Sequence, residues 1–581
     1  MTAHESSSVA DAIVDVLRDW GVRYVFGVSG ANIEHLHDAI HRLGAGRLTS
    51  VLAKREDGAG FMADCHARVH RTLGVCCSTS GGGMMNLAVG LAESLADGTG
   101  VLALVGQSPA ELDGLGAFQE ATGRAGTVDA AGLLRSVTKY TGRLTEPTNL
   151  WPMLRHAVAT ALSGRPGPAA LLIPRDVFEL DAGPRPADWP RSLADLASPP
   201  VAGPAQLRRL FAALCQAQRP VLLIGPEARA SRDFDAVPEF ARRAGIPVVT
   251  TMSARGAFPE DDDLYHGVVG ASGHPSAHEL IRRADLVLVA GSGLGVLDRQ
   301  PLAGLPAAWV AVVTLDGTVA RAVFPASLVV EGDPGTACRQ LVTMLGERPF
   351  AVPPPVGYEL RHFLPEVELA TDAGGDTLLA SQAIAAVAAW LPTNGHVLVD
   401  AGNCGASALH RLAVPRGISV TVALGMGGMG YTLPGAVGAQ LGSDGQRTVV
   451  LCGDGSFLMN GFEVHTAVDL RLPILYVIFN NHRHGTCVSR QRLLFDSRLE
   501  CTRFSPVDIA AVARGFGDPG RLWVGSAGTE AELAHRLADY HDGHTDRPGV
   551  LELRITREEV PPIVPFVRAA ATTHVVRRIA S

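Results

Sequence analysis

The stretch 451-LCGDGSFLMNGFEVHTAVDLRLPILYVIFNN-481 decides the fold of this chain. It is entered by an apolar run, Thr448–Cys452, that stops at a Gly-Asp-Gly turn. It closes with a second apolar run, Ile474–Phe479, that stops at paired asparagines. Short runs rich in Val, Ile and Leu between such breakers predict buried parallel strands. Residues 457–470 have helical spacing, so the stretch predicts a strand, a helix and a second strand.

Polar residues follow both predicted strands of this stretch. Asp454 and Asn481 then stand at the carboxyl ends of two strands, where open α/β sheets bind ligands. Gly453 and Gly455 let backbone N–H groups approach an anion closely. One carboxylate, one amide oxygen and a backbone carbonyl near Arg483 suit a Mg²⁺ that keeps water and diphosphate oxygens as its other ligands. A lone Gly-Asp-Gly is often only a turn with an aspartate cap, but the paired asparagines favour the metal site.

This pattern resembles the diphosphate-anchoring motif of thiamine-diphosphate enzymes, in which GDG is followed by a spacer and NN. The resemblance implies that Asp454 and Asn481 are Mg²⁺ ligands and that the backbone carbonyl of Arg483 completes the protein's share. It also implies thiamine diphosphate as the cofactor. The cofactor-binding residues expected from this motif are Gly453, Asp454, Gly455, Ser456 and Asn481.

Length and composition limit the classes of protein to consider. The 581 residues allow three or four domains, and 47% hydrophobic with 19% charged residues is typical of a globular protein. The net charge is −8 and no basic block is present, so neither nucleic acid nor a membrane is expected as a partner. The start MTAHESSSVA does not resemble a signal peptide. Nine scattered cysteines, an odd number, indicate a reduced, cytoplasmic protein.

Strand-like and helix-like segments alternate along most of the chain, which predicts parallel sheets with crossover helices. Residues 183–204 and 346–375 are rich in Pro, Ala, Gly or Asp and are predicted linkers. We therefore expect an α/β fold with three Rossmann-like, doubly wound domains. Their names below are those of the matching domains in thiamine-diphosphate enzymes. They are a pyrimidine-binding domain (1–182), a central domain (203–345) and a diphosphate-binding domain (376–560), followed by a tail (561–581) that we expect to cover the site as a lid.

Glu56 follows a predicted strand of the first domain, inside the sequence KREDGAGF. A charge cluster at the start of a helix is commonly solvent-exposed, with its acids favoured by the helix dipole. The resemblance implies a catalytic role instead: Glu56 falls at the position of the glutamate that hydrogen-bonds N1′ of the aminopyrimidine and so promotes loss of the C2 proton of the thiazolium. Many relatives have His before this glutamate, whereas this chain has Arg55.

Two further segments of the first domain continue the resemblance. The sequence SGGGMMN at 80–86 is similar to the family's SGPGxxN loop, which implies cofactor contacts from Ser80 and from Gly82, where relatives have Pro. The sequence GAFQE at 116–120 resembles the AFQE segment of the acetohydroxyacid synthase branch, in which Phe118 and Gln119 approach the substrate. Lys139 lies in SVTK, which is also similar to that branch, and is a predicted catalytic residue.

The third domain has two more loops of this kind. Gly402, Asn403 and Cys404 stand where the family often has Gly-Gln-His against the diphosphate; Cys404 does not match His as a donor. The sequence GMGGMGY at 425–431 resembles the loop that holds the cofactor bent. There Met429 is expected under the bend and the carbonyl of Gly427 is expected to accept a bond from N4′. A polarizable, unbranched Met suits such a gap, although most Met residues are ordinary core residues.

The resemblance implies a carboligase that decarboxylates a 2-oxo acid, with pyruvate as the expected donor, and transfers the acyl unit to a second carbonyl. Simple decarboxylases of the family carry a His pair in the first-domain loop, and Gln107–Glu120 contains no His. The alternatives are an aldehyde-releasing decarboxylase, a flavin-linked oxidase and a catalytically dead binding homologue. FAD is disfavoured, because flavin-binding relatives carry RFDDR where this chain has LGVLDR at 294–299.

The assembly and the acceptor are the last expectations. Glu56 and Asp454 lie in different domains, and in the family each half of the site comes from a different subunit, so a homodimer or a dimer of dimers is expected. Arg490 stands where housekeeping acetohydroxyacid synthases have a Trp that favours 2-oxobutyrate. A guanidinium suits a carboxylate or a phosphate, so Arg490 predicts another acceptor, anionic or larger; the alternative is a solvent-facing Arg.

Overall fold

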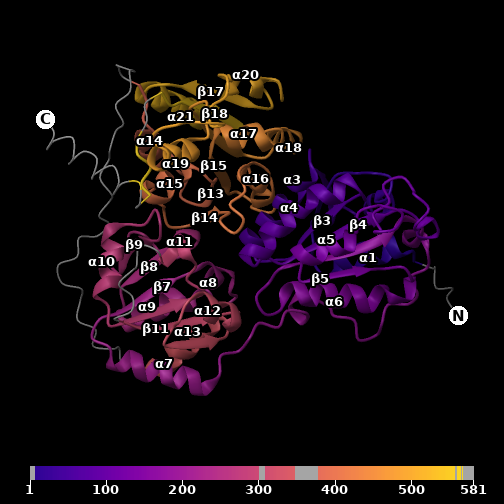
Figure 1. Cartoon of the computed structure of the whole chain (residues 1–581), viewed down its shortest axis with the longest axis horizontal. Helices are drawn as coiled ribbons and strands as arrows, with labels where there is room; N and C mark the ends of the chain where they lie inside the picture. The colour runs from indigo at the N-terminus through magenta and orange to yellow at the C-terminus, as the bar shows by residue number, and fades with distance from the viewer. Residues whose placement is uncertain (1–6, 300–307, 347–376, 557–558, 564–565, 567–581) are drawn as a thin grey trace. The chain divides into compact units, whose positions relative to one another are not determined.

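The computed structural model describes residues 7–299, 308–346, 377–556, 559–563 and 566 (Figure 1). The chain divides into two compact units. The first unit comprises Met1–Pro199 and Gly425–Gly442, and the second comprises Pro200–Leu424 and Ser443–Ser581. The predicted start of the third domain at residue 376 and most of the predicted tail 561–581 lie outside the described residues.

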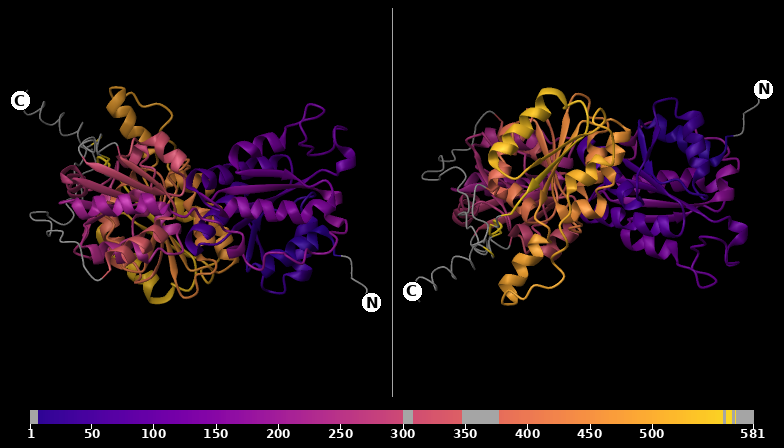
Figure 2. Two further views of the ribbon diagram at one scale, coloured as in Figure 1. Left: turned by 90° about the horizontal axis from the view of Figure 1, so that it is seen from below. Right: turned by 90° about the horizontal axis from the view of Figure 1, so that it is seen from above.

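The first unit is built on a six-stranded sheet with the strand order β2-β1-β3-β4-β6-β5. All neighbouring strands are parallel. Helices cover both faces of the sheet (Figure 2). The strands are β1 (Tyr24–Gly27), β2 (Thr49–Leu52), β3 (Gly74–Ser78), β4 (Val101–Gln107), β5 (Tyr140–Arg143) and β6 (Pro168–Pro174). The main helices are α1 (Val9–Asp19), α2 (Glu34–Leu43), α3 (Glu56–His70), α4 (Gly82–Asp97), α5 (Ala130–Val137) and α6 (Leu150–Leu162).

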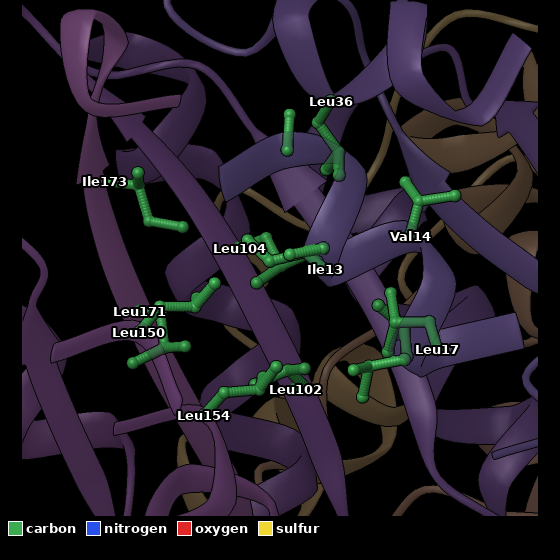
Figure 3. Packing of buried hydrophobic residues seen from close by; sticks show 14 of the residues in the cluster. Ile13, Val14, Leu17, Leu36, Leu102, Leu104, Leu150, Leu154, Leu171 and Ile173 are labelled. Atoms are coloured by element: carbon green, nitrogen blue, oxygen red, sulfur yellow. The ribbon is translucent and has the colours of Figure 1, made fainter. Parts of the chain in front are cut away.

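The core of the first unit lies between its sheet and the helices α1, α2 and α6 (Figure 3). Helix α1 begins after Ser8, whose hydroxyl accepts a hydrogen bond from Asp11 N at 3.2 Å, and apolar residues recur along one of its faces. Every residue of β4 and β6 is buried, as expected for central parallel strands. The labelled side chains of this core are Ile13, Val14, Leu17, Leu36, Leu102, Leu104, Leu150, Leu154, Leu171 and Ile173.

The second unit contains two further parallel sheets of six strands. The central sheet has the order β12-β11-β10-β7-β8-β9, which reverses direction between β7 and β10. Its strands are β7 (Pro220–Ile224), β8 (Val248–Thr251), β9 (Tyr265–Val269), β10 (Leu286–Ala290), β11 (Trp309–Thr314) and β12 (Leu328–Glu331). Its helices are α7 (Pro204–Gln216), α8 (Pro226–Ala230), α9 (Ala236–Ala244), α10 (Pro275–Arg283), α11 (Val296–Arg299), α12 (Gly317–Val323) and α13 (Pro334–Leu345).

The third sheet repeats the topology of the first sheet, with the order β14-β13-β15-β16-β18-β17. Its strands are β13 (Gly395–Val399), β14 (Ile418–Val422), β15 (Arg447–Gly453), β16 (Ile474–Asn480), β17 (Trp523–Ala527) and β18 (Gly549–Arg554). The helices of this part of the chain are α14 (Ala380–Trp390), α15 (Asn403–Arg411), α16 (Thr432–Gln440), α17 (Asp454–Asn460), α18 (Glu463–Asp469), α19 (Gly485–Leu494), α20 (Ile509–Arg514) and α21 (Glu530–Gly543). Helix α16 belongs to the first unit, although it connects β14 to β15.

The predicted α/β fold with three doubly wound parallel sheets is confirmed. The strand, helix and strand expected within 451–481 are present, but the helical part is divided. Helix α17 begins at Asp454, three residues before the predicted start, and ends at Asn460. Gly461 follows as its C-cap, and the Gly461 N–H donates to the Phe457 carbonyl. Among the described residues, none of the helices combines the length and the apolar character needed to cross a membrane.

Candidate active site

In the sheet of the first unit the strand order reverses between β1 and β3. The loops that follow these two parallel strands pack against each other. A Cβ on Gly30 would lie 2.8 Å from the Thr79 Cβ, so only glycine fits there without displacing the next loop. Asn32 donates to the Ser80 hydroxyl at 2.6 Å, and both residues are buried. Ser80 therefore joins the loop after β3 to the loop after β1. Its contact with the cofactor stays a prediction.

Glu56 is the first residue of α3 and follows β2 at the same edge of the sheet. Its Oε2 accepts a hydrogen bond from Asn86 Nδ2 of α4 at 2.9 Å. Its Oε1 lies 2.9 Å from the position of a Cβ on Gly83, so a larger residue there would displace the carboxylate. Arg55 is exposed, and its Nε lies 3.4 Å from an Asp57 carboxylate oxygen. Glu56 is therefore held in one orientation by α4.

The predicted substrate loop is organised by the carboxylate of Glu120. Glu120 accepts hydrogen bonds from the N–H groups of residues 114, 116 and 117 at 2.6, 2.9 and 3.2 Å, and from the Thr122 hydroxyl at 2.5 Å. The bond from Thr122 and those from the backbone lower the pKa of Glu120. This turn leaves Phe118 82% exposed and gives Gln119 a φ of +59°. A residue other than Gly or Asn rarely holds such a φ without a structural or functional reason.

Gln119 is brought to the edge of the sheet that carries Glu56. Its Oε1 accepts a hydrogen bond from the Thr79 hydroxyl at 3.4 Å, and its Cβ lies 3.2 Å from where a Cβ on Gly81 would stand. The Thr79 side chain also lies close to Gly83, which in turn contacts Glu56. The predicted acid and the predicted substrate amide are thus neighbours of the same glycine loop.

Lys139 lies at the opposite edge of this sheet. It immediately precedes β5, so it stands at the amino end of a parallel strand, whereas Glu56 follows the carboxyl end of β2. Its Nζ donates to the carbonyl oxygens of Thr160, Ser163 and Arg165 at 2.7 to 2.8 Å. The geometry therefore does not support the predicted catalytic role: the ammonium caps the last turn of α6, where a cation is favoured.

In the third sheet, Asp454 links the turns at the carboxyl ends of β15 and β16, and this residue is only 2% exposed. Its Oδ1 accepts from Gly455 N at 2.8 Å, and its Oδ2 accepts from Asn481 N at 3.0 Å and from His482 N at 2.5 Å. Burial raises the pKa of this carboxyl group, and the three N–H donors oppose that shift. Asp454 therefore joins the turn after β15 to the turn after β16. Arg483 Nε donates to the Asn481 carbonyl at 2.9 Å, which braces the second turn.

The two asparagines after β16 have different surroundings. Asn480 is buried, and its Nδ2 donates to the Val507 carbonyl at 2.8 Å and to Glu552 Oε1 at 2.6 Å. Asn481 is half-buried, and its Nδ2 lies 3.4 Å from where a Cβ on Gly485 would stand. The first asparagine thus holds the sheet edge together, which leaves the second as the ligand candidate.

Gly402 and Asn403 form the start of α15, directly after β13. Gly402 has a φ of +124°, and a Cβ there would meet no atom within 4 Å. Asn403 is fixed on α19: its Oδ1 accepts from the Thr486 hydroxyl at 2.9 Å and its Nδ2 donates to the Ser489 hydroxyl at 3.1 Å. An open glycine at the start of a helix lets an anion reach the free backbone N–H groups.

Two predicted cofactor contacts of the third sheet have structural partners instead of an open face. The Ser456 hydroxyl is fully buried and donates to Asp400 Oδ1 at 2.7 Å. Cys404 is buried, and burial raises the pKa of its thiol to about 12. The thiol lies 3.9 Å from where a Cβ on Gly453 would stand. A protonated thiol packed behind the glycine turn shapes the turn but carries no charge to a ligand.

The loop at 425–431 belongs to the first unit. Gly427 has a φ of +64°, and a Cβ on Gly427 or Gly428 would meet no atom within 4 Å. Met429 is half-buried, and Met426 is 62% exposed. This loop therefore offers backbone and a flexible side chain to open space, which fits the prediction for Gly427 and Met429 without testing it. Gly82, at the start of α4, has open space of the same kind.

Several residues that organise the strand ends of the two units were not singled out by the sequence. They are Asn32 and Thr79 in the first unit, and Asp400 and Glu552 in the second. Glu552 gives the clearest signal: it is an acid inside the apolar strand β18, and a buried acid in such a strand needs hydrogen-bond donors. Its carboxylate accepts from Asn480, from Ile509 N at 3.1 Å and from the Ser526 hydroxyl at 3.2 Å. The sequence shows the acid but not which loop supplies the donors.

Comparison with known proteins agrees with this fold. Three family models of thiamine pyrophosphate enzymes match the chain: the N-terminal TPP binding domain at residues 7–126, the central domain at 207–341 and the C-terminal TPP binding domain at 400–553. The three sheets and the three matches together define a thiamine-diphosphate-dependent enzyme.

Curated relatives narrow this class. The acetolactate synthase large subunit of Parasynechococcus marenigrum (strain WH8102) is 30% identical over 605 aligned residues, covering 97% of this chain and 90% of the relative. The acetolactate synthase isozyme 2 large subunit of Escherichia coli (strain K12) is 30% identical over 559, covering 96% and 97%. A probable acetolactate synthase large subunit of Methanocaldococcus jannaschii is 27% identical over 584, covering 96% and 93%. This chain belongs to the acetolactate synthase-like family of thiamine-diphosphate-dependent enzymes.

Proposed function

We propose that this enzyme is a carboligase that decarboxylates a 2-oxo acid, with pyruvate as donor, and joins the acyl unit to a second carbonyl compound. The observation that carries the proposal is the loop held by Glu120, which brings Gln119 beside the glycine loop of Glu56. The side chain placed there is an amide, which does not titrate near neutral pH. Releasing an aldehyde requires a proton donor at the acyl carbon, and Gln107–Glu120 contains no His.

The residues present fit the cofactor at both sheet edges. We propose that Glu56 binds the aminopyrimidine, and that the start of α15 with the turn at Asp454 binds the diphosphate. Among the described residues no three His, Cys, Asp or Glu side chains gather to hold a metal ion by themselves. A Mg²⁺ held by Asp454, Asn481 and the Arg483 carbonyl, with phosphate oxygens and water, needs only one carboxylate. When bound, thiamine diphosphate supplies the electron sink that lets a 2-oxo acid lose carbon dioxide.

We propose that the working enzyme is a homodimer or a dimer of dimers in which Glu56 and Asp454 of one site come from different subunits. Met85 and Val89 support this: both are exposed, one turn apart on α4, and Met85 precedes the Asn86 that holds Glu56. Mixing inactive Glu56→Gln and Asp454→Ala subunits should then restore activity in mixed dimers. Mixed dimers that remain as inactive as the parents would contradict the shared site.

We propose that the acceptor is anionic or larger than 2-oxobutyrate. Arg490 is exposed on α19, the helix whose Thr486 and Ser489 hold Asn403 at the proposed diphosphate site. A guanidinium on this helix offers several N–H donors to a carboxylate or a phosphate. No FAD-dependent step is part of this proposal.

The experiment that tests the function is product identification. The enzyme is incubated with pyruvate, Mg²⁺ and thiamine diphosphate, alone and with a panel of 2-oxo acids and aldehydes, while carbon dioxide and products are followed. The proposal predicts products with a new carbon–carbon bond. Acetaldehyde as the main product would establish a decarboxylase, acetate an oxidase, and cofactor binding without carbon dioxide release from any donor would indicate a binding homologue.

A further inference from the structure

A buried cluster of charges lies between α3 and α4 of the first unit, and its side chains have not been used so far. Arg68 Nε donates to Asp64 Oδ1 at 2.6 Å, and its Nη1 donates to Asp97 Oδ2 at 2.5 Å. Its Nη2 lies 3.7 Å from Glu93 Oε1. The side chains of Asp64 and Glu93 are 0% and 2% exposed. One guanidinium thus faces three carboxylates in a largely buried place.

Backbone contact between the two helices sets this cluster. A Cβ on Gly90 would lie 2.7 Å from Gly60 Cα, so α3 and α4 touch where both residues are glycine. Asp64 and Arg68 are four residues apart on α3 and so lie on one face, as do Glu93 and Asp97 on α4. The glycine contact therefore brings the two acid-bearing faces to either side of the Arg68 guanidinium.

The cluster holds both ends of the loop at 425–431. At the first end, Met426 N donates to Glu93 Oε2 at 3.0 Å, and a Cβ on Gly425 would lie 2.7 Å from an Asp97 carboxylate oxygen. At the other end, the Tyr431 hydroxyl donates to Asp64 Oδ1 at 2.6 Å. The Arg68 guanidinium also lies 5.5 Å from the centre of the Tyr431 ring. Between these anchors lie Gly427, Gly428 and Met429, with open space beside both glycines.

Burying these charges destabilises the fold, so the cluster needs a structural role that apolar residues would not fill. Three carboxylates and one guanidinium leave an excess of negative charge when all are ionised, and an imbalance of buried charge destabilises a fold. Apolar residues would pack α3 against α4 without this cost. The polar groups instead supply what apolar side chains lack, namely directed acceptors for one backbone N–H and one hydroxyl of the same loop.

We propose that Glu93 and Asp64, ordered by Arg68, are positioning residues that set the conformation of the loop 426–431 and thereby the affinity for thiamine diphosphate. The inference rests on the proposed function only in taking this loop as a cofactor contact. Glu93 acts through the backbone of Met426 and Asp64 acts through the hydroxyl of Tyr431, so neither needs to touch the cofactor.

The test combines hydrogen exchange of the cofactor-free full-length protein with a titration by thiamine diphosphate and Mg²⁺. Glu93→Leu removes the acceptor for Met426 N, whereas Glu93→Gln keeps an acceptor oxygen of the same reach. We expect Glu93→Leu to speed exchange in peptides spanning 425–431 and to weaken cofactor binding about tenfold, the size of one lost buried hydrogen bond. Glu93→Gln should stay within about threefold of the wild type. Glu146→Gln changes an exposed glutamate of the same unit and should change neither quantity.

Tyr431→Phe keeps the result informative if Glu93→Leu does not fold, because it removes only the hydroxyl that donates to Asp64. It should move both readouts in the same direction. Folded Glu93→Leu or Tyr431→Phe protein with unchanged exchange and unchanged cofactor affinity would overturn the proposal. The exchange measurement uses no substrate, so its outcome does not depend on whether the enzyme is a carboligase.

Discussion

The Glu56 carboxylate accepts a hydrogen bond from the Asn86 amide, and its other oxygen lies against Gly83, where a side chain would displace it. Glu56→Gln keeps the size but no longer exchanges a proton with the aminopyrimidine. We expect deuterium exchange at C2 of the thiazolium to slow by about 10² to 10⁴, the usual contribution of a positioned acid–base group, while the cofactor still binds. Exchange is followed by NMR after quenching with acid, with exposed Glu111→Gln as the control. An unchanged rate would remove Glu56 from this role.

Asp454 has two tasks, because it is both the proposed metal ligand and the acceptor for three backbone N–H groups. Asp454→Ala should abolish retention of thiamine diphosphate, since both the negative ligand and the join between two turns are lost. The cofactor content is measured after gel filtration with Mg²⁺ and after dialysis against EDTA. Asp469→Ala, which changes an exposed acid on α18, is the control. A folded Asp454→Ala protein that kept its cofactor would defeat the assignment.

At the scale of the elements, the helix pair α3 and α4 makes a prediction about pH. Burial, and then the neighbouring Asp97, raise the pKa of Glu93 to about 7 from its ordinary value of 4.5, although Arg68 opposes the shift. The folded state then holds this proton more tightly than the unfolded state. The resulting stability is complete below about pH 4.5 and is lost as the pH rises through about 7. Tyr431 and Cys65, which face the same cluster, stay protonated there because burial raises both of their pKa values.

Glu93→Gln cannot ionise, so it should lack this loss of stability. Urea unfolding of the wild type and the variant between pH 5 and pH 8 isolates the effect, since all other groups titrate in both proteins. The midpoint of the wild type should fall relative to that of Glu93→Gln as the pH rises. A constant difference between the two midpoints would show that Glu93 does not titrate in this range.

Helix α19 carries the prediction on the acceptor. Arg490→Trp introduces the aromatic residue expected at this position in housekeeping acetohydroxyacid synthases. The variant should use the native acceptor less efficiently and 2-oxobutyrate more efficiently. Competition between acceptors at fixed pyruvate measures the ratio of kcat/KM values directly. Arg498→Trp, on an exposed arginine after the helix, controls for the added aromatic group. A wild-type enzyme that already prefers 2-oxobutyrate would contradict the specialised acceptor.

The elements that the sequence predicted best are those with a strong local signal. The apolar runs at β15 and β16 and the turns that end them are local properties, so the order of strand, helix and strand followed from the residues. The division between α17 and α18 was not predicted, because the apolar spacing continues across Gly461. Likeness of its segment predicts a catalytic Lys139, whereas the bounds of β5 and its parallel pairing place this residue at the amino end of the strand.

The charge cluster of Arg68 shows what a single sequence leaves out. Asp64 and Arg68 have helical spacing, and so do Glu93 and Asp97, but such pairs are usually solvent-exposed. Their burial depends on the contact between Gly60 and Gly90 and on a loop more than 300 residues further along the chain, as the bond from Met426 N to Glu93 shows. Long-range pairing of this kind follows from packing, which periodicity does not encode.

At the scale of the whole molecule, the first and third sheets share one strand order. In each of them a candidate site residue follows the carboxyl end of a strand. Glu56 follows the second strand of the first sheet, and Asp454 follows the third strand of the last sheet. Two copies of one topology thus present different side chains at these ends, an oriented acid in one and the proposed anion and metal site in the other, and the proposed reaction needs both.

The proposed enzyme transfers the acyl unit of a 2-oxo acid into a new carbon–carbon bond. The most direct measurement is a carbon balance with ¹³C-labelled pyruvate, Mg²⁺ and thiamine diphosphate, in which NMR follows the labelled methyl carbon and an electrode follows carbon dioxide. For each carbon dioxide released, we expect one labelled acyl unit to appear in a ligation product, with pyruvate or an added anionic carbonyl compound as acceptor. Glu56→Gln should abolish both signals. Label that accumulates as acetaldehyde or acetate in equal amount to the carbon dioxide would contradict it.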